Sequence, residues 1–193
     1  MNSFYAVDFE AANNKWDICQ VGVTKVENGI VTNTESHYVK PPGEFWRSHT
    51  RIHGITKNDV RNAFMFKKMY SEILEPIKNE KIIFWDVASD RKILKANMNR
   101  HGMEMISTNK FECAQQYARL VSSFTPPNYK LKVVAEYLGL SFRAHDAGED
   151  SYVTAMIYLH CMDLVNKDPS VLLTTKQLKQ IQRERDQNAS NNN

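Results

Sequence analysis

The sequence predicts an α/β fold with a mixed five-stranded sheet, an antiparallel meander followed by parallel strands, flanked by helices. Two patterns carry this prediction. Apolar residues alternate along much of the first forty positions, as they do in half-buried strands, and beyond residue 59 they recur at helical spacing between short apolar runs. Strands that come first, followed by alternating helices and strands, favour a mixed sheet with helices on its faces.

The first three strands are expected over residues 4–10, 18–26 and 30–39. Asn28-Gly29 lies between the second and the third strand, and because both residues tolerate a positive φ, the pair predicts a hairpin turn. Pro41-Pro42 ends the third strand, because proline has no N–H to donate to a neighbouring strand. The chain therefore opens with three antiparallel strands.

The remaining elements follow from the change of period at residue 59. Helices are expected over 59–77 and 89–102, and each is followed by a short strand, over 81–84 and near Ile106 respectively. Three further helices are expected over 111–121, 131–139 and 147–164. Thr56 or Asn58 is available to cap the first of these helices, and Ser89 the second. After Leu173 the chain is rich in Lys, Gln and Arg. We therefore expect one domain over 1–173 and a polar, partly disordered tail over 174–193.

Composition excludes several classes of protein. With 193 residues and 42% apolar side chains, the chain can bury a substantial core and is too apolar to be disordered. It lacks the roughly 20-residue apolar run of a membrane helix, and Asp8 interrupts the N-terminus before a signal peptide could form. The three cysteines are far apart and form no CxxC pair, so the sequence suggests neither a disulfide framework nor a zinc knuckle. We expect a soluble, cytoplasmic protein with no membrane partner.

The positive charge is concentrated near the C-terminus. The formal net charge is +3, and the residues beyond 174 account for most of it, so the body is close to neutral. A near-neutral body attracts a polyanion weakly. If the protein handles nucleic acid, something other than protein charge, such as bound metal, must therefore help to neutralise the phosphates.

Asp8 and Glu10 lie on the first expected strand. Side chains alternate along a strand, so both carboxylates project from one face while Val7 and Phe9 take the other. Two such carboxylates repel each other and resist burial unless a cation lies between them, and hard divalent ions prefer oxygen ligands. The alternative, an edge strand with solvated acids, is the commoner explanation of so short a motif on its own.

His145 and Asp150 form a second motif. Their spacing places the histidine on the loop that enters the last helix and the acid in its first turn. Asp150 then shares a helix face with Val153 and Ile157, which must pack on the sheet. An acid on a packed face is unusual unless it is paired or binds metal. The alternative is a first-turn acid favoured by the helix dipole, beside an exposed histidine.

Asp90 is a third candidate, because it follows the buried strand over 81–84 and begins a helix. Ligands commonly gather beyond strand ends in α/β sheets. Taken alone, the position of Asp90 is better explained by the favourable charge of an acid at a helix N-terminus.

These motifs, in this order, resemble the DEDDh branch of the DnaQ-like exonucleases, the group that contains polymerase proofreading subunits and RNase T. The resemblance runs from Phe4 to Leu164. It includes Pro41-Pro42, the stretch Ile52-His53-Gly54-Ile55-Thr56, and residues 129–140.

The resemblance implies a ribonuclease H-like fold and removal of nucleotides from the 3′ end of DNA or RNA with two Mg²⁺ or Mn²⁺ ions. Carried over residue by residue, four acids ligate the ions and His145 is the general base that deprotonates the attacking water, a role suited to an imidazole. The four acids are Asp8, Glu10, Asp90 and Asp150. The implied partner is single-stranded or 3′-end nucleic acid. A separate polymerase or other nucleic-acid-processing chain and a homodimer are also compatible with it.

By the same analogy, the backbone around Phe9 and Ala11 holds the 3′-terminal nucleotide, and His53 and Ile55 contact its base or sugar. An ordering role for His53 in the loop before the next helix is an equal alternative. The sequence assigns no role to Trp16, for which core packing is the default.

The chain departs from the family pattern at Trp85-Asp86, where members usually have His-Asn. Trp85 either stacks on a base or fills the space of the missing histidine. Asp86 either supplements Asp90 or pairs with a lysine. This departure supports a second hypothesis, a catalytically weak family member that acts as a nucleic-acid- or partner-binding module.

Overall fold

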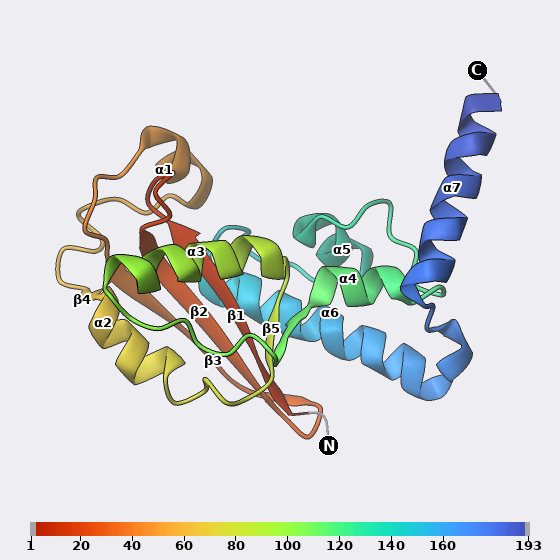
Figure 1. Ribbon diagram of the computed structural model, residues 1–193, viewed down its shortest axis with the longest axis horizontal. Helices are drawn as coiled ribbons and strands as arrows, with labels where there is room; N and C mark the ends of the chain where they lie inside the picture. Colours follow the sequence, from red (N-terminus) through yellow and green to blue (C-terminus); the bar gives the residue numbers. More distant parts are fainter. Residues whose placement is uncertain (1–2, 192–193) are drawn as a thin grey trace.

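The computed structural model describes residues 3–191, except for the side chains of 182, 184–186 and 188–191 (Figure 1). Six strands form one sheet in the order β4-β3-β2-β1-β5-β6. They are β1 (Phe4–Ala11), β2 (Ile18–Glu27), β3 (Ile30–Lys40), β4 (Phe64–Met65), β5 (Ile82–Phe84) and β6 (Phe111–Cys113). β1, β2 and β3 are antiparallel, whereas β5 is parallel to β1 and β6 to β5. The predicted mixed α/β sheet is confirmed, with β4 as an additional edge strand.

Helices cover both faces of this sheet. They are α1 (Arg47–His53), α2 (Phe66–Met69), the π-helix η1 (Tyr70–Leu74), α3 (Val87–Arg100), α4 (Ala114–Leu120), α5 (Leu131–Tyr137), α6 (Ala147–Lys167), the 3-10 helix η2 (Pro169–Val171) and α7 (Thr175–Asn191). Val7 and Phe9 of β1 pack in one cluster with side chains from α2 and α3. Phe4 and Ala6, on the opposite face, pack in a second cluster with α4, α5 and α6. The sheet therefore separates two apolar cores.

The meander agrees closely with the prediction. Asn28 and Gly29 turn the chain between β2 and β3 with φ angles of 52° and 82°, as the Asn-Gly pair predicts. The alternation on β1 also holds, since Val7 and Phe9 are buried on one face while Asp8 and Glu10 lie on the other.

The expected helix over 59–77 is wrong in its first part. Thr56 donates from its N–H and its hydroxyl to the Asp59 carboxylate, at 2.8 and 2.6 Å, and the following residues form turns. β4 then pairs with the end of β3, and the helical segment begins only at Phe66. The unpaired edge of β3 offers hydrogen bonds that outweigh the local helical pattern. α1, at 47–53, was not expected.

The fifth predicted strand is misplaced. Ile106 is buried against the α3 side of the core without being part of a strand, and the strand lies at Phe111–Cys113, where a helix was expected. β6 pairs with β5 over three residues, and α4 begins directly afterwards, at Ala114. Burial of one apolar residue does not distinguish a strand from a packed loop, so the pattern around Ile106 was ambiguous.

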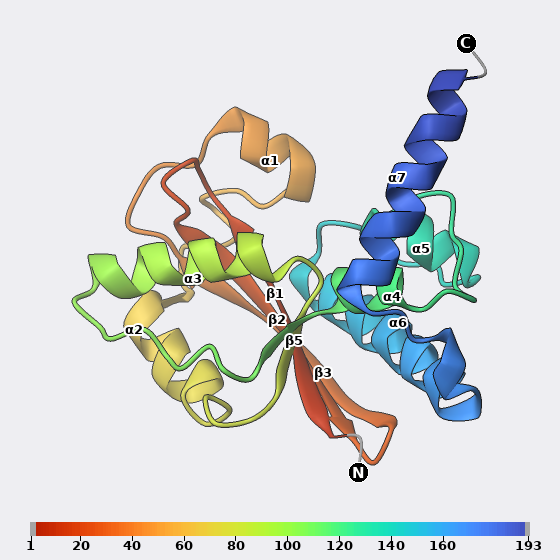
Figure 2. The ribbon, with the colours of Figure 1, turned by 45° about the vertical axis from the view of Figure 1, so that its right-hand side comes forward.

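The C-terminal region leaves the body beside α4. Leu172 pairs with Val121, and α7 then projects away from the two cores (Figure 2). α7 is helical over Thr175–Asn191, and the last two residues of the expected disordered tail lie outside the described range. The domain boundary at 173 stays a prediction. None of the helices over residues 3–191 combines the length and apolar character that are required to cross a bilayer.

Candidate active site

A cleft of about 330 Å³ lies at the end of β1, between α3 and the beginning of α6. Its lining includes all five residues that were predicted as catalytic: Asp8, Glu10, Asp90, His145 and Asp150. Of the residues predicted to bind substrate, Phe9, Ala11 and Trp85 line the cleft, and His53 and Ile55 do not. The fold therefore brings together side chains separated by more than 140 positions in the sequence.

Gly22 of β2 controls how close α6 comes to the acids of β1. It lies directly opposite Asp8 in the β1–β2 ladder. A Cβ atom at position 22 would overlap the backbone of Ala147 and Gly148 at the start of α6. Glycine is therefore required where the helix end crosses the sheet. Sequence reasoning missed this residue, although a glycine inside an apolar strand signals such a close approach.

Polar contacts then fix the beginning of α6. Asp146 caps the helix by accepting hydrogen bonds from the N–H groups of Gly148 and Glu149, at 3.1 and 3.3 Å. Gln20 of β2 accepts a hydrogen bond from the Ala147 N–H at 3.1 Å. One further hydrogen bond links the Ser151 and Thr24 hydroxyls, at 2.9 Å. As predicted, this places Asp150 in the first turn, buried to 6% exposure.

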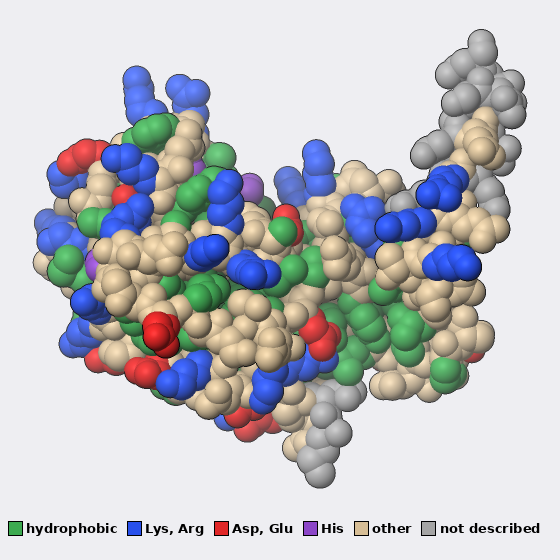
Figure 3. Space-filling model, viewed as in Figure 1, with side chains coloured by type: hydrophobic (Ala, Val, Ile, Leu, Met, Phe, Trp, Pro, Cys, Tyr) green, Lys and Arg blue, Asp and Glu red, His purple; other side chains and the backbone are tan. Residues whose placement is uncertain are grey.

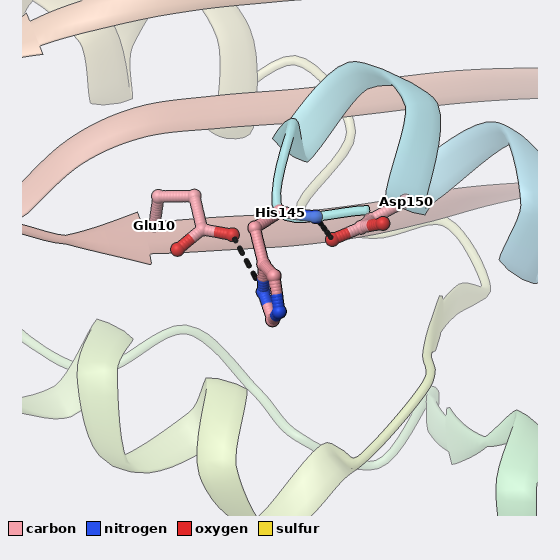
Figure 4. Close-up of side chains that lie close together, drawn as sticks. All are labelled: Glu10, His145 and Asp150. Atoms are coloured by element: carbon pink, nitrogen blue, oxygen red, sulfur yellow. Dashed lines mark hydrogen bonds and ion pairs between the residues drawn. The ribbon is translucent and has the colours of Figure 1, made fainter. Parts of the chain in front are cut away.

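His145 lies at the mouth of the cleft, directly before this helix. Its backbone has a φ of 67°, in the left-handed region, and its N–H donates to Asp150 Oδ2 at 3.0 Å. Its Nδ1 lies 3.9 Å from Glu10 Oε1, and the side chain is 55% exposed. Figure 4 shows that Glu10, from β1, and His145 and Asp150, from the start of α6, converge on one point.

Asp90 reaches the cleft from the opposite side, in the first turn of α3. Asp86 caps this helix, because its Oδ1 accepts a hydrogen bond from the Ala88 N–H at 3.1 Å. The expectation that Ser89 is the cap is therefore wrong, and Asp86 has a helix-capping role that neither proposed alternative included. Trp85 is 8% exposed and packs with the α6-side core, which favours its space-filling role.

Burial, and then the charges of neighbouring acids, destabilise the charged forms of the four carboxylates. Burial, with the charges of Asp150 and Asp146, raises the pKa of Asp8 well above its ordinary value. Burial and the charges of Asp8 and Asp150 raise the pKa of Glu10 to about 9. Burial raises the pKa of Asp150 to about 7, against the hydrogen bond from the His145 N–H. Asp90 also has a raised pKa, for which burial and the Asp8 charge are the main causes.

The cleft fits a divalent cation. Its described lining contains no lysine or arginine, so no permanently charged basic side chain within it balances the acids. Asp150 Oδ1 is buried without a hydrogen-bond partner among the described residues. Ligand atoms of Glu10, His145 and Asp150 lie within 4.8 Å of one another. Carboxylate oxygens are the ligands that Mg²⁺ and Mn²⁺ prefer, so these residues can hold such an ion.

His53 and Ile55 have contacts that hold α1 to the sheet. His53 Nδ1 accepts the N–H of Ile55 at 3.0 Å, so its Nε2 carries the proton that points to Ala11 O at 3.3 Å. Ile55 is buried with Ala12 and Cys19. These contacts favour the ordering role of His53, and substrate contact by either residue stays a prediction.

Sequence reasoning also missed His49, which lines the cleft. Its Nδ1 lies 2.9 Å from Ala11 O and its Nε2 lies 2.8 Å from Asn14 Oδ1. His49 is one helical turn before His53, so both imidazoles contact the same carbonyl from one face of α1. The spacing of four residues on a helix was the signal that could have found it.

A mixed sheet that carries a carboxylate cluster able to hold a metal ion, at the end of its central strand, is an arrangement typical of divalent-metal-dependent nucleases. The chain belongs to the RNase T family of exonucleases, whose family model, described as Exonuclease, matches residues 6–158. This confirms the resemblance to the DnaQ-like exonucleases.

Curated relatives agree with this family. The chain is 24% identical over 177 residues to a PolC-type DNA polymerase III of Thermotoga petrophila. The matched region covers 86% of this chain and 12% of the polymerase. It is 24% identical over 183 residues to the 3′-5′ exonuclease DinG of Bacillus subtilis, covering 92% of this chain and 19% of DinG. The chain thus spans less than a fifth of the length of these relatives.

Solved structures confirm the fold. Exonuclease X, in complex with 5′ overhanging duplex DNA, has a TM-score of 0.64 and 19% identity, covering 90% of this chain and 96% of that one. The nuclease domain of 3′hExo, a DEDDh family member bound to rAMP, has a TM-score of 0.68 and 17% identity, covering 84% and 93%. The predicted ribonuclease H-like architecture is therefore correct.

Proposed function

We propose that this chain removes nucleotides from the 3′ end of DNA or RNA by metal-dependent hydrolysis. One observation carries the proposal: the carboxylates of β1, α3 and α6 converge beside one imidazole, and the described lining of the cleft contains no lysine or arginine to balance them. A site that raises the pKa values of its own acids is costly unless it binds positive charge. The membership of the exonuclease family supports the same activity.

Asp8, Glu10, Asp90 and Asp150 are the residues proposed to hold two Mg²⁺ or Mn²⁺ ions. When bound, such ions supply positive charge for the phosphate and lower the pKa of water. The protein's part is to fix the carboxylates in place. The Gly22 contact brings Asp150 to the acids of β1, and the helix cap at Asp86 orients the first turn of α3, which carries Asp90.

His145 is proposed as the general base. Its imidazole lies on the open side of the cluster of four carboxylates, where a water molecule and the nucleic-acid strand can reach it. The imidazole accepts a proton from the attacking water, and the Glu10 carboxylate at 3.9 Å stabilises the imidazolium that results. The hydrogen bond from the His145 backbone to Asp150 couples the position of the base to that of the acids.

The backbone of Phe9 and Ala11 is proposed to hold the terminal nucleotide, since both residues line the cleft. His53 and Ile55 support it through α1, and Trp85 forms part of the floor. The polymerase context of the relatives is compatible with a separate polymerase or processing chain as partner, and a homodimer is a further arrangement that we propose to test. The three free cysteines suit a reducing, cytoplasmic location.

The test is hydrolysis of matched single-stranded DNA and RNA oligonucleotides, labelled near the 5′ end to follow shortening, by the purified chain in Mn²⁺ or in EDTA. We expect stepwise shortening and release of mononucleotides in Mn²⁺ and none in EDTA. Asp8→Ala should abolish the release, and His145→Ala should slow it by roughly 10²–10⁴-fold, the usual contribution of a general base. A circular single strand should stay intact.

Binding of these oligonucleotides by folded protein, without shortening in Mg²⁺ or Mn²⁺, would contradict the proposal. That outcome would support the second hypothesis, a nucleic-acid-binding module without nuclease activity. Cutting of the circular strand would instead indicate an endonuclease on the same fold.

A further inference from the structure

The C-terminal helix α7 has an apolar face and a basic face. Leu178 and Ile181 are half-buried and line an apolar groove that the loop after α4 completes. Lys176, Lys179 and Arg183 are exposed. Residues three or four apart share one face of a helix, and residues one or two apart do not, so the basic and the apolar residues lie on different faces. The apolar face therefore holds α7 to the body, and the basic face is open to solvent.

Hydrogen bonds fix the beginning of α7 against the end of α4. The Leu173 N–H donates to Leu120 O at 2.7 Å. Thr174 then caps α7, because its hydroxyl accepts the Gln177 N–H at 3.2 Å, while Gln177 Oε1 accepts the Thr174 N–H at 2.8 Å. The fold therefore determines where the first basic residues of α7 lie relative to α4.

A groove of about 420 Å³ lies between α4 and α7, and we call it the basic groove. The polar residues of its lining are Gln115, Gln116, Arg119, Thr175 and Lys179. Its described lining contains two cations, two amides and a hydroxyl group, and no aspartate or glutamate. Amide, hydroxyl and basic side chains are the groups that bind phosphate oxygens and sugars in nucleic acids. The composition of the groove therefore suits a polyanionic strand.

The basic groove adjoins the wall of the carboxylate cleft. The Gln115 N–H donates to Trp85 O at 3.1 Å, and the Gln115 side chain donates to Tyr129 O at 2.9 Å. Trp85 and Leu131 line the carboxylate cleft. Lys130, directly before Leu131, is exposed. A strand that leaves the cleft on this side therefore passes Lys130 and reaches the basic groove next.

The charge of this region favours nucleic acid over a protein as the ligand. Figure 3 shows lysine and arginine side chains gathered on α7 and beside it. The Arg119 guanidinium lies 4.4 Å from the centre of the Tyr129 ring, a contact that holds it at the groove. Lysine is depleted at protein–protein interfaces, whereas lysine and arginine are the usual contacts of phosphates. The acids of the cleft repel a polyanion, so a basic surface beside the cleft supplies an attraction that the cleft lacks.

We propose that the basic groove and the basic face of α7 bind phosphates of the nucleic-acid strand upstream of its 3′-terminal nucleotide. This inference rests on the proposed function, because it takes this strand to be the substrate. Phosphate contacts carry no sequence information, so the groove holds strands of any sequence. A second contact on the same strand also raises the effective concentration of the 3′ end at the cleft, which favours repeated removal of nucleotides.

The binding test uses the triple variant K176Q/K179Q/R183Q, in which the three exposed basic residues of α7 become glutamine. Affinity for a single strand of about 16 nucleotides is measured by fluorescence anisotropy in Ca²⁺ at several salt concentrations. The dissociation constant should rise by roughly tenfold or more. The slope of its logarithm against the logarithm of salt concentration should fall by about 2, because each phosphate contact on a single strand contributes about 0.7.

Hydrolysis in Mn²⁺ separates the basic groove from the cleft. The short substrate is a nucleoside 5′-phosphate ester with a chromogenic leaving group, which has no upstream strand. The triple variant should hydrolyse it with an unchanged kcat/KM, and should show a KM raised roughly tenfold for the long strand. The matched control is K40Q/K67Q/K68Q, which removes the same charge at the β4 edge of the sheet, opposite β6 and α4. It should behave like the wild type toward both substrates.

Equal affinity of the wild type and the triple variant for the long strand would overturn the inference and would make a protein the better candidate partner of α7. An equal loss of affinity in K40Q/K67Q/K68Q would also overturn it, because net charge alone would then explain the effect. Failure of the proposed function has a different signature. In that case the wild type hydrolyses neither substrate in Mn²⁺, while the anisotropy measurement in Ca²⁺ still decides whether α7 binds the strand.

Discussion

Asp17 and the carboxylates of the cleft are both removed from water, yet their surroundings are opposite. Asp17 is 1% exposed, forms an ion pair with Arg100 and accepts a hydrogen bond from the Asn13 amide at 2.9 Å. Asp90, at 5% exposure, faces Asp8 and Glu10 and no basic side chain of the cleft lining.

This difference shows that the fold can neutralise a buried acid with its own arginine and does so next to the site. Within the cleft, the fold places several acids close together and provides no lysine or arginine of the described lining to balance their negative charge. Burial of an unpaired charge is costly, whereas a group that gains an external cation recovers that cost. The comparison supports the proposal that Asp17 serves stability and the cleft acids serve binding, and each prediction below tests that division.

The largest expected difference is between Asp8→Asn and Asp17→Asn. Asp8→Asn removes a repelling charge, so the metal-free protein should melt at a higher temperature while metal-dependent hydrolysis is lost. Asp17→Asn leaves the Arg100 charge without its partner and should cost about 3 kcal/mol of stability, with hydrolysis retained by the folded protein. Denaturant unfolding and mononucleotide release measure the two effects. The division fails if both variants lose stability and keep activity.

Gly22→Ala should move Asp150 away from the other cleft acids, although it replaces none of these acids. The added methyl group overlaps the start of α6 and must push Asp150 away from β1, at a cost of about 1–3 kcal/mol. Hydrolysis should fall by more than the loss of folded protein explains. Gly29→Asn is the control, because Gly29 has open space around it and asparagine accepts its positive φ. Unchanged activity of folded Gly22→Ala would contradict the close approach.

Metal and pH should act on the cleft acids together. The pKa of Glu10 in the folded protein is raised to about 9 from an ordinary 4.5, so folding favours its neutral form. The corresponding stability is fully present below pH 4.5 and is lost progressively as the pH rises toward 9. The metal-free protein should therefore become less stable between pH 5 and 9.

Mg²⁺ or Mn²⁺ should reverse this trend, because bound cations favour the ionised acids. The rise in melting temperature on adding metal should be small at pH 5 and grow toward pH 9. Glu10→Gln should flatten the metal-free profile. A metal-induced stabilisation that does not depend on pH would show that the cations bind elsewhere.

The smallest expected effects concern Asp86. Asp86→Ala removes the cap of α3 and should cost about 1 kcal/mol. Asp86→Asn keeps the cap and removes a charge that raises the pKa of Asp90, so stability should change little or increase. Equal destabilisation by both variants, measured by urea unfolding, would mean that the charge of Asp86 is itself needed.

Prediction from the sequence succeeded where local contacts decide the structure. The Asn28-Gly29 turn, the alternation on β1 and the position of Asp150 in the first turn of α6 depend on neighbours within a few residues. It failed over 59–65 and around Ile106, where pairing with β3 and packing on α3 overrule the local pattern.

The sequence by itself determined which residues are proposed as catalytic, because their chemistry belongs to their side chains. It also determined that Asp8 and Glu10 share one strand face, because side chains alternate along any extended backbone. Only the tertiary structure decided that Gly22 leaves room for α6, that Asn97 holds Trp16 at the cleft, and that Asp17 pairs with an arginine whereas the described cleft lining around Asp90 contains none. These are distances between segments far apart in the chain, and they exist only once both apolar cores have packed against the sheet.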